Sequence, residues 1–141
     1  MSIVKIRAAL ESQLLTITPV IPTVFENMPY TPVNGAPYQR ADLLPAETQS
    51  PSFGDNFRRE TGIFQVMLCY PTVNASDLYQ GSGDANARAE LIRASFVRRT
   101  SLVFGGVYVI IERHPSVGAA IIAGDRFCLP VRIRYFANIQ V

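Results

Sequence analysis

The residue types that do chemistry in proteins are few in this chain and lie far apart. The sequence has one histidine, His114, directly before Pro115. A metal site built on imidazole needs further ligands, and no cluster of carboxylates surrounds His114 in the sequence. We therefore interpret His114 as an exposed structural residue and expect no metal site.

Motifs for phosphate binding and nucleophilic catalysis are also missing. Gly81-Ser82-Gly83 lacks the third glycine and the following Lys-Ser or Lys-Thr of phosphate loops. There is no Gly-x-Ser-x-Gly nucleophile elbow. Nothing in the sequence pairs the carboxylates of the predicted elements as an acid and a base: Glu60, Glu90, Glu112 and Asp125. We predict no catalytic residue and no cofactor, and a protein that is not an enzyme.

The two cysteines, Cys69 and Cys128, have no metal-ligand spacing and fall inside predicted strands. We interpret them as separate, small core or half-buried residues. A reducing cytosol, where disulfides are rare, is the expected setting. Charged residues at Lys5, Arg7 and Glu11 interrupt the N-terminal apolar pattern, so we expect no signal peptide.

The composition favours one folded domain over residues 1–141. Apolar residues make up 48% of the chain, enough for a core of its own. The net charge of +2 is far from that of a dedicated nucleic-acid binder. The longest apolar stretch, Val103 to Ile111, is too short to span a membrane. All basic residues but Lys5 are arginines, which suit ion pairs at protein interfaces.

Two helices are expected to cover a sheet. The first begins after Ser2 and ends before Pro19, with an apolar stripe at spacings of three and four: Ile3, Ile6, Leu10, Leu14 and Ile17. The second runs from about residue 84 to 97, and its apolar face holds Ala85, Ala89, Ile92 and Phe96. Its other residues, Arg88, Glu90 and Arg93, are expected to face water.

Six strands are predicted from alternation and apolar runs: Thr23–Glu26, Tyr38–Leu44, Thr61–Tyr70, Val107–Glu112, Ala119–Ala123 and Phe127–Phe136. The nearly continuous apolar run 107–112 indicates a strand buried on both faces. The order of elements predicts an α+β fold: a two-layer sandwich with a mostly antiparallel or mixed sheet of about five to six strands and two helices packed on one face. The opposite face, with Gln65, Met67, Arg132 and Arg134, is left for water or a neighbour.

Two segments could carry an interface. Residues 48–60 are polar and turn-rich, and we interpret them as a mobile loop whose Phe53 and Phe57 either anchor a partner or fold back onto the domain. A basic cluster surrounds the end of the second helix: Arg88, Arg93, Arg98 and Arg99. These cations complement the exposed helix carbonyls, or alternatively contact acidic groups or phosphates.

Short patterns in a fixed order, across nearly the whole chain, resemble the phage tail terminator family, also called tail completion or tail-to-head joining proteins. An amphipathic first helix ends near Thr16, and Glu60-Thr61-Gly62-Ile63-Phe64-Gln65-Val66 leads to Tyr70-Pro71. A helix with Ala89, Ile92, Arg93 and Phe96 follows. Pro130-Val131-Arg132-Ile133-Arg134-Tyr135 resembles the closing strand of the family.

The resemblance implies a structural protein that caps the end of the tail tube, stops its polymerisation and forms the head-joining interface. It implies a ring, typically a hexamer, through which DNA passes only as cargo, and which can be a monomer when free. The implied partners are other copies of the chain, the tail tube protein and a head completion or connector protein, without a membrane. The implied location is the cytoplasm of the bacterial host during assembly, then the tail or neck of the virion.

A loop of such proteins becomes ordered on assembly, and residues 48–60 match it. The interface candidates are therefore Phe53, Phe57, Arg58 and Arg59 in this segment, together with Arg132 and Arg134 on the uncovered face of the sheet. A ring needs a heterologous contact, which an acid-rich first half and an arginine-rich second half would permit. Two alternatives stay open: a head-tail connector or tail-tube subunit, and a small nucleic-acid-binding module that uses the second helix.

Overall fold

A computed structural model describes residues 2–17, 21–26, 28–29, 31, 36–48, 57–71, 83–123 and 126–140 of this chain. The helices are α1 (Ser2–Leu15) and α2 (Gly83–Ser95). The strands are β1 (Thr23–Phe25), β2 (Tyr38–Pro45), β3 (Phe57–Pro71), β4 (Ser101–Phe104), β5 (Val107–Ile111), β6 (Ser116–Val117), β7 (Ile121–Ala123) and β8 (Arg126–Gln140).

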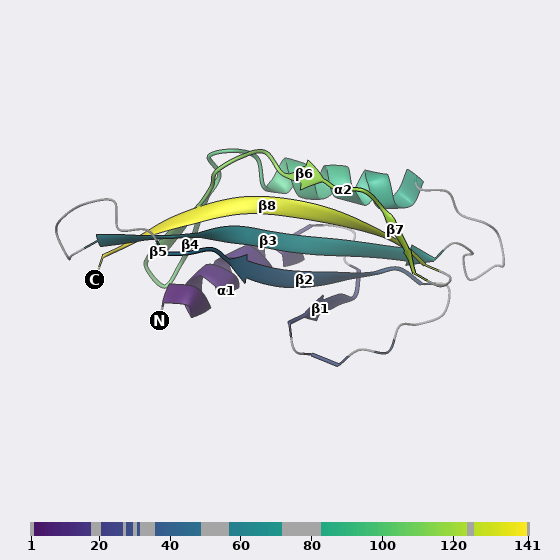
Figure 1. Ribbon diagram of the computed structural model, residues 1–141, viewed down its shortest axis with the longest axis horizontal. Helices are drawn as coiled ribbons and strands as arrows, with labels where there is room; N and C mark the ends of the chain where they lie inside the picture. The colour runs from purple at the N-terminus through teal and green to yellow at the C-terminus, as the bar shows by residue number, and fades with distance from the viewer. Residues whose placement is uncertain are drawn as a thin grey trace.

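The strands form one sheet in the order β1-β2-β3-β8-β5-β4 (Figure 1). Beyond this path, β6 and β7 pair with β8 on the side where β5 also lies. Every pair is antiparallel except β1 with β2, which is parallel. The α+β class and the mostly strand-built sheet are thus confirmed.

The sheet is built around its two longest strands, β3 and β8. They pair residue for residue from Phe57 opposite Gln140 to Pro71 opposite Arg126. Successive side chains of a strand point to opposite faces, so this one register decides which residues of both strands lie inside. On β3 the inner residues are Phe64, Val66 and Leu68, and on β8 they are Val131, Ile133, Tyr135 and their alternate neighbours.

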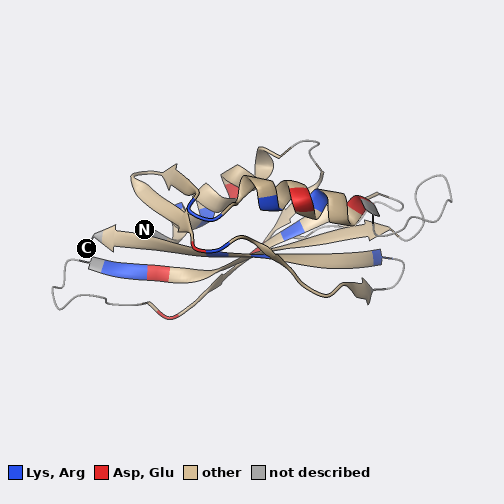
Figure 2. Cartoon of the chain, turned by 90° about the horizontal axis from the view of Figure 1, so that it is seen from above, with Lys and Arg blue, Asp and Glu red and all other residues tan. Residues whose placement is uncertain are grey.

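One core joins this inner face to both helices. The expected stripe of α1 is buried from Ile6 to Leu14, while Ile3 remains 41% exposed. The expected face of α2 is buried throughout, and the Phe96 ring lies 6.3 Å from that of Phe64 on β3. Figure 2 shows α2 lying along one side of the strands. The sheet is curled into a half barrel, and the two-layer sandwich that we expected stays a prediction.

The strand expected at 61–70 is longer than predicted. Phe57, Arg58, Arg59 and Glu60 were assigned to a loop, and the structure places them at the start of β3, paired with residues 137–140 of β8. That assignment was wrong because their order comes from a partner strand almost eighty residues away, which local polarity does not reveal. Phe53 lies outside the described residues.

The first strand of the β4–β5 hairpin was not predicted from the sequence. Its turn residues Gly105 and Gly106 both have positive φ, at 56° and 81°. Such backbone angles favour glycine and fit the twist of a tight two-residue hairpin. A Gly-Gly pair between two apolar runs is a hairpin signal that the sequence did contain. The short strand β6 was also not predicted.

The strand expected to be buried on both faces is buried on one. In β5, Val109 and Ile111 are fully buried, whereas Tyr108 between Val107 and Val109 is 58% exposed. The apolar run misled the prediction because β5 lies in a sheet whose second face is not covered by any helix. The opposite error concerns Arg88 of α2, whose side chain was expected to face water and is buried.

The two cysteines are not separate thiols as expected: Cys69 and Cys128 form a disulfide. The β3–β8 register places them directly opposite each other, with their Cα atoms 4.1 Å apart. Both side chains are buried on the sheet face that points away from the helices. The prediction failed because the sequence gives the strand in which each cysteine lies but not their register.

We predict that the disulfide stabilises the fold. Closing a chain segment of 59 residues restricts the unfolded state, which contributes about 2–4 kcal/mol. Urea denaturation of the oxidised protein should therefore show a higher midpoint than the same protein with a reductant. A Cys69→Ala, Cys128→Ala double variant is the control, because its midpoint should not respond to reductant. Equal midpoints for the oxidised and reduced wild-type protein would show that the disulfide does not stabilise the folded state.

Candidate functional site

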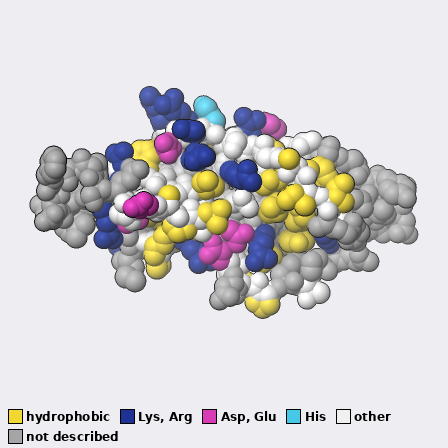
Figure 3. All heavy atoms as spheres, in the orientation of Figure 1, with side chains coloured by type: hydrophobic (Ala, Val, Ile, Leu, Met, Phe, Trp, Pro, Cys, Tyr) yellow, Lys and Arg dark blue, Asp and Glu magenta, His cyan; other side chains and the backbone are white. Residues whose placement is uncertain are grey.

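The sheet has a second face that the helices do not cover, and we call it the outer face. On β3 it carries the odd-numbered residues from Arg59 to Met67, and on β8 the even-numbered ones from Pro130 to Asn138. Figure 3, in the orientation of Figure 1, shows charged side chains of both signs mixed with apolar ones. A mixed surface of this kind is typical of the rim and core of protein interfaces.

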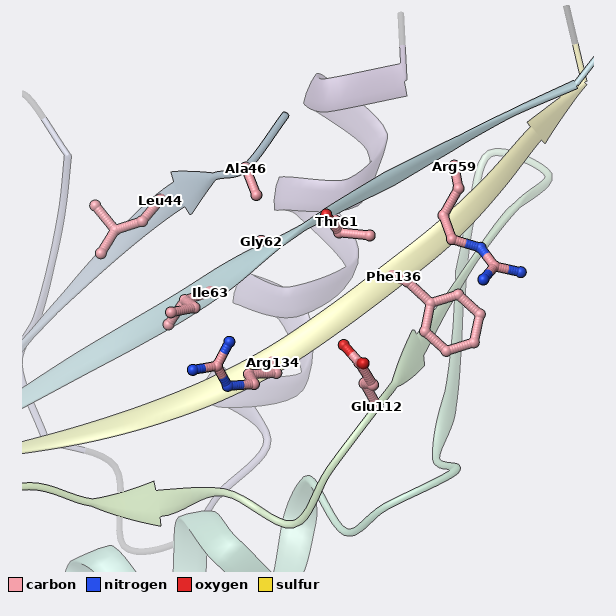
Figure 4. A pocket seen from close by; sticks show the side chains of 9 residues that line it. All are labelled: Leu44, Ala46, Arg59, Thr61, Gly62, Ile63, Glu112, Arg134 and Phe136. Carbon is pink, nitrogen blue, oxygen red and sulfur yellow. The ribbon is translucent and has the colours of Figure 1, made fainter. Parts of the chain in front are cut away.

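A shallow hollow of about 270 Å³ lies on the outer face (Figure 4). Its lining comes from three strands, β2, β3 and β8, and from one residue each after β2 and β5: Leu44, Ala46, Arg59, Thr61, Gly62, Ile63, Glu112, Arg134 and Phe136. It is open and wide, with apolar side chains beside two guanidinium groups and one carboxylate. That composition fits a side chain of a docking protein better than a reacting small molecule.

Arg59 is held in place at one end of the hollow. Its guanidinium carbon lies 4.9 Å from the centre of the Phe136 ring, a cation–π contact. Its Nε donates a 3.0 Å hydrogen bond to Oδ1 of Asn138 on the neighbouring strand. These contacts fix the planar group before any partner arrives, which lowers the entropy cost of binding.

Arg134 and Glu112 line the hollow on one side and are both exposed (Figure 4). In the part of the chain that the structure describes, neither side chain makes a hydrogen bond or ion pair. Backbones join them instead, since the N–H of Glu112 donates to the carbonyl of Arg134 at 2.9 Å. Arg132, two residues before Arg134, donates from Nε to Oε1 of Gln65 at 3.2 Å. The free guanidinium of Arg134 can therefore accept a carboxylate from outside.

The structure separates two neighbouring candidates. Arg58 points to the opposite face from Arg59, because the two are adjacent on one strand. There Arg58 forms an ion pair with Glu60, with Nε 3.0 Å from Oε1. The sequence-predicted residues that come together on the outer face are thus Arg59, Arg132 and Arg134. Phe57 begins β3, and Phe53 lies outside the described residues.

Gly62 closes the inner side of the hollow. A Cβ atom built there would lie 2.6 Å from the Tyr135 hydroxyl and 2.7 Å from the carbonyl oxygen of Leu44. The Tyr135 ring is buried behind Gly62, and among the described residues its hydroxyl has no hydrogen-bond partner. Burial raises the pKa of Tyr135 to about 12, and the nearby charge of Glu60 adds to this rise.

The basic cluster near α2 does not form one patch. Arg88 is buried, and desolvation lowers the pKa of its guanidinium while Tyr70 opposes that shift. Burial likewise raises the pKa of Tyr70. Arg93 donates from Nε to the carbonyl of Pro115 at 3.1 Å. The imidazole Nδ1 of His114 accepts the backbone N–H of Arg98 at 3.3 Å, a structural contact at the end of the helix.

Within the described residues no group of three or more histidine, cysteine or acidic side chains is placed to hold a metal ion. Neither helix, α1 or α2, has the length and apolar character to cross a membrane.

The model of one protein family, described as phage tail terminator protein, matches residues 5–135. The chain belongs to the phage tail terminator family. This family is structural and non-enzymatic, so the chain is a structural protein of a phage-type tail and not an enzyme.

Two solved structures are similar to this terminator-family chain. One, whose name states no function, superposes with a TM-score of 0.75 at 28% identity, covering 100% of this chain and 97% of that one. The other is a chain of the virion of a native gene transfer agent particle, with a TM-score of 0.57 at 15% identity, covering 99% and 98%. At that identity the second match shows a shared fold. No curated protein sequence matches the chain.

Sequence reasoning missed part of the site in this terminator-family protein. Leu44, Glu112 and Phe136 line the hollow but were not candidates. Phe136 could have been found, because it continues the alternation of Arg132 and Arg134 along the last strand. Leu44 and Glu112 could not, since only the order of strands in the sheet brings them beside β3 and β8.

We predict that alkaline pH destabilises this protein through Tyr135. The folded chain keeps the phenol protonated to about pH 12, whereas an unfolded tyrosine loses its proton near pH 10. Stability is therefore full below about pH 10 and falls, by up to about 2–3 kcal/mol, as the pH rises towards 12. Denaturant titrations across this range should show that decline. In Tyr135→Phe it should shrink to the part that Tyr70 causes, and an unchanged decline would contradict the assignment.

We also predict that Gly62→Ala destabilises the fold by about 1–3 kcal/mol, because the new methyl group meets backbone atoms that cannot move aside. The matched control is Gly118→Ala. Its Cβ would approach only side-chain atoms, Cγ of Pro130 at 3.0 Å and Nη1 of the flexible Arg132 at 3.3 Å, and no backbone atom as close as those at Gly62. Urea denaturation should give the larger loss at position 62. Equal losses would contradict the close approach of Tyr135.

Proposed function

We propose that this protein caps the finished end of a tail tube, stops tube polymerisation and presents the surface to which the head joins. It acts as a ring of copies, with a hexamer as the expected size, and DNA passes through without being read. Its partners are further copies of itself, the tail tube protein and a head completion or connector protein. The proposed location is the tail or neck of the particle after assembly in the host cytoplasm.

The match to the terminator family over residues 5–135 carries this proposal. The shared fold with a chain of a gene transfer agent virion is consistent with a role inside a particle. Both comparisons concern nearly the whole chain, so the proposal does not depend on a small shared motif.

The outer face supplies the chemistry that a docking role needs. It carries Arg59, Arg132 and Arg134 beside apolar side chains, and Arg134 has no partner among the described residues. A guanidinium group binds carboxylates in a planar, two-bonded geometry, which adds direction as well as attraction. Such groups fix the orientation of a partner and suppress wrong ones. We infer that the outer face contacts an acidic surface of a neighbour in the tail.

Charge reversal on the outer face tests this inference. Arg134→Glu and Arg59→Glu should weaken capping at least about tenfold, because like charges would meet the acidic partner. The measurement is tail length by electron microscopy in particles that carry the variant, and failed capping gives overlong tails. Arg58→Glu distinguishes the contribution of Arg59 from that of its neighbour, because the Arg58 side chain points to the face opposite the outer face. Arg113→Glu, at an exposed residue outside the hollow, is the matched control.

The outcomes distinguish the proposal from its alternatives. Tails of normal length that fail to join heads would identify a connector instead. Salt-dependent DNA binding by the isolated protein would favour a nucleic-acid module. Tails of normal length with normal joining in Arg134→Glu would remove the outer face from the interface.

A further inference from the structure

The β4–β5 hairpin exposes apolar side chains at an edge of the sheet. No charged residue lies between Thr100 and Glu112. Despite this, Val103 is 56% exposed, Phe104 45% and Tyr108 58%. Soluble proteins usually protect an edge strand with charges, proline or a covering element. An uncharged hairpin at the end of the strand order is therefore a surface suited to being covered.

The first turn of α1 extends this surface. The side chain of Lys5 passes the hairpin turn, and its Cε would lie 3.0 Å from a Cβ at Gly105. Val4, beside it, is 58% exposed. We define the hairpin patch as Val4, Val103, Phe104 and Tyr108. It wraps around the edge of the sheet, since Val103 and Tyr108 point to the outer face and Phe104 points to the side of the helices.

A second uncharged surface lies at the other end of β8. No charged residue lies from Ser116 to Gly124. We define the β7 patch as Val117, Ile121 and Ile122, which are 39%, 55% and 74% exposed. It also wraps around an edge, since Ile121 points to the outer face and the other two point to the side of the helices. Ile111 of the hairpin pairs with Tyr135, and Ile121 pairs with Cys128. This separation along one strand puts the two patches about 23 Å apart, at opposite ends of the long axis (Figure 1).

We propose that the hairpin patch of one copy binds the β7 patch of the next copy. The inference rests on the proposed ring and names the surfaces that close it. Two different patches at opposite ends of one molecule make a heterologous, head-to-tail contact, which is the kind that generates rings.

The exposed area agrees with this assignment. With about 200 Å² for a fully exposed large apolar residue, the exposed fractions give about 400 Å² for the hairpin patch and about 300 Å² for the β7 patch. A standard interface buries about 1,200–2,000 Å² in total, and somewhat more than half of that area is apolar. Counted over both faces of the sheet, the two patches together reach the lower end of that apolar area. The residues that define the two patches are uncharged, and Lys5, whose side chain lies against Gly105, borders the hairpin patch.

Two charge insertions test the contact by sedimentation equilibrium up to millimolar concentration. Wild-type protein should associate, while Tyr108→Glu and Ile122→Glu should each do so at least about thirtyfold more weakly. Leu91→Glu, at an exposed apolar residue of α2 outside both patches, is the matched control and should associate like the wild type. Thermal melting checks that each variant is folded. If one is not, Tyr108→Ser or Ile122→Ser takes its place.

Mixing the two variants gives the sharper result. Tyr108→Glu keeps a sound β7 patch and Ile122→Glu a sound hairpin patch, so the mixture should form heterodimers and nothing larger. A mixture that stays monomeric would overturn the pairing of these patches. Association of either single variant as strong as that of the wild type would overturn it too, while the ring itself would stand. A wild-type protein that stays monomeric at every concentration would overturn this contact between free copies, while a ring that forms only on the tube end would stand.

Discussion

The pairing of β3 with β8 is the constraint on which the rest of the molecule depends. These strands run antiparallel over their whole length, and their common register decides at once which side chains enter the core. A shift of β8 by one residue against β3 would turn Val131 outward and bring Arg132 into the core. Burying a guanidinium without a partner is far more costly than losing a contact, so the register is strongly specified. The helices then cover the apolar face that this register creates.

The same pairing explains why the outer face is an ordered platform. Arg59, Arg132 and Arg134 stand on the two central strands, whose backbones are hydrogen-bonded on both sides for much of their length. A surface for recognition is most accurate when its side chains start from rigid elements. The contact of Arg59 with Phe136 and Asn138 shows this ordering at one position. Loops are not needed to bring these groups together.

Local pattern in the sequence predicts much of this fold, because alternation is a local property. The inner and outer residues of the last strand, including Arg132 and Arg134, follow from their parity, and the buried face of α2 follows from its spacing. What could not be predicted depends on pairing between distant segments. The start of β3 at Phe57, the bond between Cys69 and Cys128, and the place of Glu112 in the hollow all need the strand order. The burial of Arg88 was not predicted for a related reason. The spacing of residues on a helix does not show how much of a side chain is covered by segments that are distant in the sequence.

The cross-strand disulfide gives this chain a property that changes with its surroundings. Inside a bacterial cytoplasm, glutathione and thioredoxin keep such cysteine pairs as thiols, whereas outside the cell the pair closes. A particle that carries this chain out of its host would therefore gain a covalent tie between its two central strands after construction is complete. The dithiol form, which is less stable, would be present during assembly, and the more stable disulfide form would be present in the released particle.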